Sequence, residues 1–117
     1  MTTRCEVELD IFSGMPNPTW TLVDSEAETF LKRVAALAQA PASELEGNLG
    51  YRGFIVQCTT GANAQVIRIQ AGVVQIVHGG ATLYARDESR SVERWLLGTG
   101  KAHLKPEIFE IVERELG

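Results

Sequence analysis

The chain has 117 residues and a mass of 12.8 kDa, enough for one domain with a single sizeable core. Its formal charge is −4, and its Lys and Arg residues are scattered rather than clustered, which argues against a nucleic-acid partner and an anionic membrane surface. No apolar run approaches the roughly 20 residues that span a bilayer, and the N-terminus lacks the apolar segment of a signal peptide, so we expect a cytoplasmic protein without membrane contact.

The first third of the chain predicts a strand, a loop and a helix. Residues 4–12 alternate between apolar and acidic side chains, which indicates a half-buried strand with Glu6, Glu8 and Asp10 on a solvated face. A loop over 12–22 follows. A Ser-x-x-Glu capping box at Ser25 then begins a helix over about 25–40, and Pro41 ends it.

The rest of the chain predicts a run of strands and then two helices. After a loop over 41–51, with room for one helical turn, we expect strands over about 52–59, 65–70, 73–78 and 81–86. Asp87 is placed to cap a helix that ends at Gly98, and Pro106 suits the first turn of a last helix. The order β-α-β-β-β-β-α-α predicts an α+β fold, with a mostly antiparallel sheet of about five strands and three helices, in a single domain over 1–117.

Two cysteines, Cys5 and Cys58, lie inside predicted strands. In a reducing compartment we expect both to be small buried thiols, and a disulfide is possible only if the two strands are neighbours.

No catalytic or metal-binding pattern is present in the sequence. His78 and His103 each stand alone, without the spacing of metal ligands, and no nucleophile is paired with a base. We therefore expect no catalytic residue, no metal and no cofactor, and we favour a protein that is not an enzyme.

The loop Phe-Ser-Gly-Met-Pro-Asn-Pro-Thr-Trp-Thr-Leu, residues 12–22, is unusually constrained. Pro16 and Pro18 fix two φ angles and push the preceding residues into extended conformations, so the loop is stiff before anything binds. Trp20 suits either an interface or the core, and we expect it in the core. We expect Met15, an adaptable apolar contact, to be exposed.

Tyr51-Arg52-Gly53-Phe54 is the second unusual segment. An arginine between aromatic residues can present a bidentate fork to a carboxylate or phosphate. The alternative, which we favour, is that Arg52 tethers the 41–51 loop through Asp10 or a backbone carbonyl.

These two segments resemble the signatures of a family of small uncharacterised bacterial proteins. Phe12 to Leu22 matches the family segment Phe-Ser-Gly-x-Pro-Asn-Pro-x-Trp-x-Leu, and Gly50-Tyr51-Arg52-Gly53-Phe54 is similar to its second signature. The Arg94-Trp95-Leu96-Leu97 helix is similar as well, so the resemblance covers most of the chain. The family usually carries arginine where this chain has Met15, and the resemblance implies no particular activity.

The sequence leaves three functional hypotheses. The first is a non-enzymatic binding or protein-interaction module that uses the 12–22 and 50–54 loops, with a protein partner or self-association through an open strand edge. Its candidate binding residues are Ser13, Met15, Asn17, Trp20, Tyr51 and Arg52. The second is a small-molecule-binding protein or enzyme, in which Asp10 joins Ser13, Asn17, Tyr51 and Arg52 in a polar site under the proline loop. In the third, both segments only hold the fold together.

Overall fold

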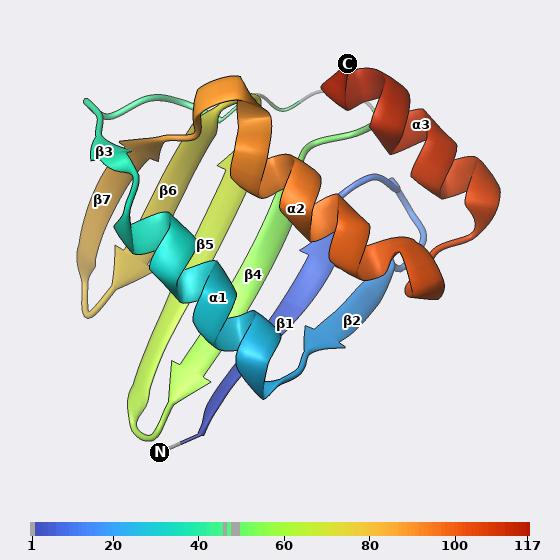
Figure 1. Cartoon of the computed structure of the whole chain (residues 1–117). Helices are drawn as coiled ribbons and strands as arrows, with labels where there is room; N and C mark the ends of the chain where they lie inside the picture. Colours follow the sequence, from blue (N-terminus) through green and yellow to red (C-terminus); the bar gives the residue numbers. More distant parts are fainter. Residues whose placement is uncertain (1, 46, 48–49) are drawn as a thin grey trace.

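The computed structural model describes residues 2–45, 47 and 50–117, and these residues form one seven-stranded antiparallel sheet with three α-helices (Figure 1). The strands are β1 (Thr3–Leu9), β2 (Thr19–Leu22), β3 (Ala38–Gln39), β4 (Phe54–Thr60), β5 (Asn63–Gln70), β6 (Val73–His78) and β7 (Ala81–Arg86). The helices are α1 (Asp24–Ala35), α2 (Ser91–Gly100) and α3 (Pro106–Leu116), with short 3₁₀ helices η1 (Glu88–Arg90) and η2 (Lys101–His103) around α2. Their spatial order in the sheet is β2-β1-β4-β5-β6-β7-β3.

The predicted α+β class is confirmed, but the described residues hold two more strands than the expected five. One of them, β2, lies inside the proline loop, where Thr19–Leu22 folds back antiparallel along β1. The other, β3, occupies the stretch expected to be the end of the first helix, because α1 ends at Ala35 and Ala38–Gln39 then pairs with β7. Both are short edge strands that form only by pairing with another strand, β2 with the preceding β1 and β3 with the distant β7, so the local pattern did not reveal them.

The remaining elements follow the sequence closely, except that α1 begins at Asp24 with Val23 as its N-cap and Glu26 bonded back to it, so the expected capping box at Ser25 is wrong. The turns at Ala71-Gly72 and Gly79-Gly80 join β5 to β6 and β6 to β7 as expected. Pro106 opens α3, whereas α2 continues two residues beyond the predicted end at Gly98. Residues 41–45 adopt no helical turn, and positions 46 and 48–49 of the expected loop lie outside the described residues.

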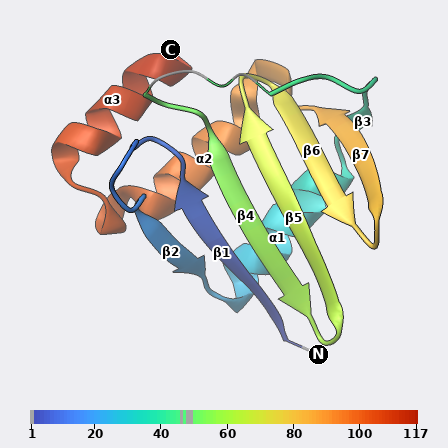
Figure 2. The same ribbon diagram turned by 180° about the vertical axis from the view of Figure 1, so that it is seen from behind.

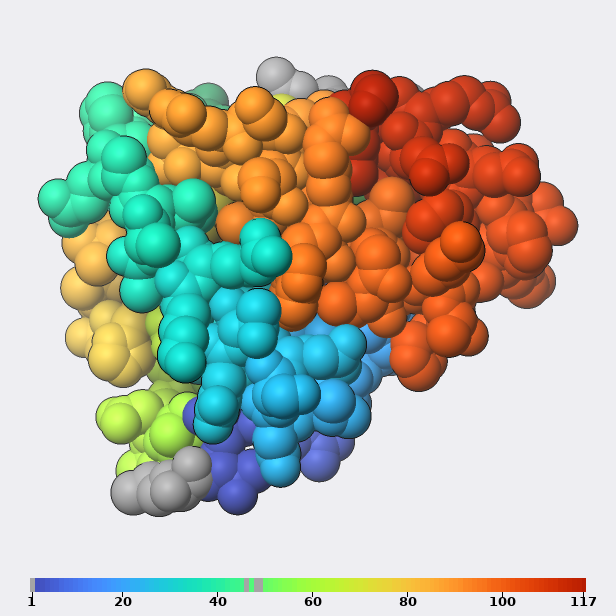
Figure 3. All heavy atoms as spheres, viewed as in Figure 1, coloured from blue at the N-terminus to red at the C-terminus, as the bar shows by residue number. Residues whose placement is uncertain are grey.

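One face of the sheet is covered by helices and the other is not. Helices α1 and α2 cross the covered face and bury the core, and their side chains hide most of the sheet in the space-filling view (Figures 1 and 3). Seen from behind, the strands have no helix over them, and the segment after β3 runs past one end of that face (Figure 2). Glu6 lies exposed on the uncovered face, as the alternating pattern of β1 predicted.

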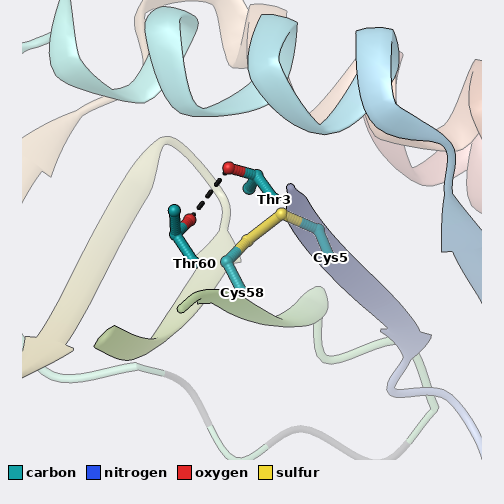
Figure 4. Close-up of a disulfide and its surroundings, with 4 residues drawn as sticks. All are labelled: Thr3, Cys5, Cys58 and Thr60. Carbon is teal, nitrogen blue, oxygen red and sulfur yellow. Dashed lines mark hydrogen bonds between the residues drawn. A yellow bond between two sulfur atoms is a disulfide. The ribbon is translucent and has the colours of Figure 1, made fainter. Parts of the chain in front are cut away.

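The expectation of two reduced cysteines is wrong. Strand β1 pairs with β4 in a register that sets Cys5 directly opposite Cys58, with 4.1 Å between their Cα atoms, and the two sulfur atoms are bonded (Figure 4). The sequence did not identify which strand would lie beside β1. The bridge joins residues 53 positions apart, and the loop-closure entropy it removes from the unfolded chain corresponds to about 4 kcal/mol of stability.

Candidate functional site

The two unusual loops are in direct contact. Arg52 lies in the segment before β4, and its Nε and Nη2 atoms donate to Asp10 Oδ1 at 3.1 and 2.9 Å. Nη2 also donates to the backbone carbonyl of Phe12 at 2.7 Å. Backbone bonds between Arg52 and Asp10 and between Asp10 and Gly53 continue the pairing of β1 with β4 to this point. Asp10 and a backbone carbonyl are the two tethers that the sequence suggested, and among the described contacts they join Arg52 to the start of the proline loop.

Asn17 holds the proline loop closed from the inside. Its Oδ1 atom accepts hydrogen bonds from the backbone N–H groups of Ile11 and Phe12, at 3.1 and 2.8 Å. Its Nδ2 atom donates to a carboxylate oxygen of Glu8 at 2.8 Å and more distantly to Asp10. Both ends of the amide are therefore engaged within the protein, and Asn17 presents little of its hydrogen-bonding capacity to a partner.

Trp20 packs in the core, as expected, at the junction of the sheet and the end of α2. Its ring meets Phe54 edge-on, with 6.3 Å between ring centroids, and lies parallel to the ring of His103. The indole N–H donates to the Thr99 hydroxyl at 3.0 Å. The backbone of α2 comes so close that a Cβ atom added at Gly100 would lie 2.5 Å from the indole. A glycine at this position is therefore required for Trp20 to seat against the helix.

Tyr51 points away from the proline loop and into a buried polar network at the start of α2. Its hydroxyl donates to Glu93, a carboxylate with no solvent exposure, and Arg90 donates to both oxygens of the same carboxylate. Asp87, also buried, accepts the backbone N–H groups of Val92 and Glu93, so it caps the helix as the sequence predicted.

Sequence reasoning identified Asp87 but missed Glu93 and Arg90. Arg90 adopts a left-handed conformation with φ of 54°, as does the preceding Ser89, and no local pattern signals that backbone. Burial of the ring, followed by the charge and hydrogen bond of Glu93, raises the pKa of Tyr51 above its ordinary value. The hydroxyl therefore stays protonated as a donor, which suits a structural role.

Ser13 and Met15 are the two candidate residues with exposed side chains, and Met15 has 58% of its surface exposed. Met15 borders a groove of about 340 Å³ between the proline loop and the start of α3. The apolar lining residues are Phe12, Met15, Pro18, Leu104 and Ile108, and we call them together the tip groove. His103, Lys105 and Glu107 add polar groups along its side.

A second hollow lies on the uncovered face of the sheet. It measures about 460 Å³ and is lined by Arg68, Gln75 and Tyr84 from three adjacent strands and by residues 42–45. The Gln75 amide donates to the Tyr84 hydroxyl at 3.1 Å. Within the described part of the chain, no hydrogen bond or ion pair joins the Arg68 guanidinium to another residue. A smaller hollow of about 160 Å³ next to it reaches Asp10 and Arg52.

The five polar residues of the small-molecule hypothesis do not form one site. Asp10, Asn17 and Arg52 bond to one another or to the loop backbone, Tyr51 turns to the opposite side, and Ser13 is exposed. Across residues 2–45, 47 and 50–117, no three side chains of His, Cys, Asp or Glu are grouped as a metal ion would require. The described helices include none that is long and apolar enough to cross a membrane. Comparison of the chain with protein-family models, curated proteins and solved structures gave no match.

The contact between Trp20 and Gly100 yields a matched pair of substitutions with opposite signs. Gly100→Ala forces a methyl group into the indole and is expected to lower the free energy of unfolding by about 1–3 kcal/mol. Gly98→Ala, in the same helix with open space around it, is expected to raise it by about 0.5–1 kcal/mol. Urea unfolding followed by circular dichroism measures both, and equal effects would contradict the proposed packing.

The raised pKa of Tyr51 predicts a specific alkaline destabilisation. Tyr51→Phe leaves buried Glu93 with one donor fewer and is expected to cost about 1–3 kcal/mol at neutral pH. Above pH of about 10 the unfolded chain loses the Tyr51 proton while the folded chain keeps it, so this part of the wild-type stability falls by about 1.4 kcal/mol per pH unit. The stability difference between wild type and Tyr51→Phe should therefore narrow as the pH rises through this range. Urea unfolding of both proteins at successive pH values measures this difference in stability. A difference that stays constant with pH would refute the raised pKa of Tyr51.

Proposed function

We propose that this protein is a non-enzymatic binding module that contacts a protein partner through the tip groove. The observation that carries the proposal is the exposure of Met15 beside a groove with a mostly apolar lining. Exposed apolar surface of this kind is unfavourable in water, and a partner that covers it gains the free energy of burial. Methionine suits such a contact because its flexible thioether adapts to the surface that it meets.

The rigidity of the proline loop supports the same function. Two prolines limit the loop backbone. The side chain of Asn17 ties the loop to Glu8 of β1, and Arg52 ties it to the segment before β4. The conformation that presents Met15 is thus already formed in the isolated chain. Binding then costs less conformational entropy than it would for a flexible loop.

The candidate residues of the module divide into two roles. Ser13 and Met15 are placed to touch a partner, because their side chains are exposed. The other four candidates form contacts inside the protein that hold the loop and the groove in place; they are Asn17, Trp20, Tyr51 and Arg52. The 50–54 segment is therefore a support of the binding surface rather than part of it.

Site-specific photo-crosslinking in the host cell tests this proposal. A benzophenone amino acid at position 15 should give a discrete crosslinked species, which the Ile108→Asp substitution in the groove wall should weaken. The matched control places the same probe at Leu83, which is similarly exposed at 52% but lies on β7, far along the sheet from the groove. Absence of any species specific to position 15, in a variant that folds normally, would reject the tip groove as a binding surface.

The alternative function, binding of a small molecule, is proposed for the hollow around Arg68. A guanidinium without a bonded partner among the described residues, beside an amide and a phenol, is suited to a carboxylate or phosphate group.

Thermal stability measured against a panel of simple carboxylates and inorganic phosphate tests this alternative. A rise in the melting temperature that Arg68→Gln abolishes would support it. Arg4→Gln is the control, because Arg4 is an exposed arginine on β1, which β4 separates from the strand of Arg68, and it should leave the response unchanged. No ligand-dependent shift in the wild type would eliminate this candidate.

A further inference from the structure

Strand β2 presents an unpaired edge at one end of the sheet. The backbone N–H of Leu9 donates to the carbonyl of Pro18, which sets the phase of the antiparallel ladder between β1 and β2. Because the direction of the backbone groups alternates along a strand, Trp20 and Leu22 also bond toward β1, whereas Thr19 and Thr21 direct their N–H and C=O groups away from the sheet. Among the described strands, none lies on that side of β2.

The two edges of the sheet differ in how they are protected. At the far edge, β3 covers the last residues of β7, and the N–H of Ala40 donates to the Tyr84 carbonyl. No described strand covers β2, and Thr19–Leu22 contains no charged residue, although charges are a common protection of exposed edges. Val23, directly after β2, is the most exposed of the large apolar residues that the structure describes, at 62%.

We propose that a second copy of this chain pairs with β2 across a two-fold axis, so that the two sheets become one continuous antiparallel sheet. This inference rests on the proposed function, because it names the partner that the loop and its groove would meet. A two-fold axis opposite Trp20 sets Thr19 of one copy against Thr21 of the other, which satisfies all four outward groups of each strand. An axis opposite Thr21 would require the N–H and C=O groups of Val23, which already bond to Glu26 and Ala27.

The same register brings exposed apolar residues together at both ends of the shared strands. It sets Val23 of one copy opposite Asn17 of the other, next to Met15 and Pro16. Both Met15 and Val23 are more than half exposed in the single chain. Their burial against one another adds a hydrophobic contribution to the backbone hydrogen bonds.

Charge complementarity favours a second copy over an unrelated extended segment. The first turn of α1, which directly follows β2, carries the acidic residues Asp24 and Glu26. The segment beside the start of β2 carries Lys101, His103 and Lys105, and His103 stacks on Trp20 while Lys105 borders the tip groove. Antiparallel pairing sets Asp24 of one copy opposite Pro16 of the other, on the side of the tip groove. Each copy therefore offers an acidic helix start to the basic segment of its partner.

Sedimentation velocity of the full chain tests the dimer. The wild type should sediment as a dimer that dissociates on dilution, and Thr21→Pro should be monomeric because proline lacks the outward N–H. Proline is compatible with an edge strand whose N–H faces solvent, so the fold should persist. The matched control is Thr82→Pro on β7, where the N–H also points out of the sheet at the opposite edge, and this variant should dimerise like the wild type.

A charge exchange provides a second test that does not depend on proline. Lys105→Glu and Asp24→Lys should each raise the dimer dissociation constant by about tenfold, because two-fold symmetry applies each change twice. The two substitutions in one chain should restore dimerisation. The charge variants test the dimer even if Thr21→Pro fails to fold.

Three results would overturn the proposal: a wild type that is monomeric at every concentration, a folded Thr21→Pro variant that still dimerises, or a double charge variant that is not restored. A monomeric wild type that still gives a crosslink from position 15 to a different protein would refute the dimer alone. Loss of that crosslink as well would refute the binding module.

Discussion

Tyr51 and Arg52, two neighbours in the chain, anchor opposite sides of the molecule. The side chain of Tyr51 bonds to Glu93 under α2, and the guanidinium of Arg52 bonds to Asp10 and the Phe12 carbonyl at the start of the proline loop. Gly53 makes this possible, because its φ of 91° turns the chain where a Cβ atom would lie 2.2 Å from the carbonyl oxygen of Ile69. The helical layer, the end of the central strands and the loop therefore meet at three consecutive residues.

The use of these residues inside the protein changes how the 12–22 and 50–54 segments are interpreted. Their polar and aromatic residues resemble a recognition site in sequence, yet Asn17, Trp20, Tyr51 and Arg52 all form contacts within the chain. Side chains engaged in this way hold the loop in position and are not available to bind a ligand. What they position is the exposed Met15 beside its apolar groove and, at the end of the same loop, strand β2, whose outer edge no described strand covers. The proposed binding function and the structural function thus fall in one segment, with different residues assigned to each.

The disulfide affects the expected cellular location. Bonded cysteines persist mainly in oxidising compartments and are rare in the cytosol of most organisms. The bond between Cys5 and Cys58 therefore weighs against the cytoplasmic location inferred from the sequence, which stays a prediction. Both cysteines are buried between the sheet and the helical layer, so the bridge contributes to the stability of the fold and lies away from the tip groove.

The sequence by itself determined the fold class, the five longer strands, the three helices, the burial of Trp20 and the exposure of Met15. These features depend on local periodicity, on caps such as Asp87 and on the low solubility of large aromatic rings, all of which can be read from neighbouring residues. Only the tertiary structure decided that β4 lies beside β1, which brings the two cysteines together, and that Thr19–Leu22 is an edge strand. It also decided that Glu93 accepts hydrogen bonds from Tyr51 and Arg90. These outcomes depend on which segments pair and pack together, and that is decided by the packing of the whole core rather than by any local pattern.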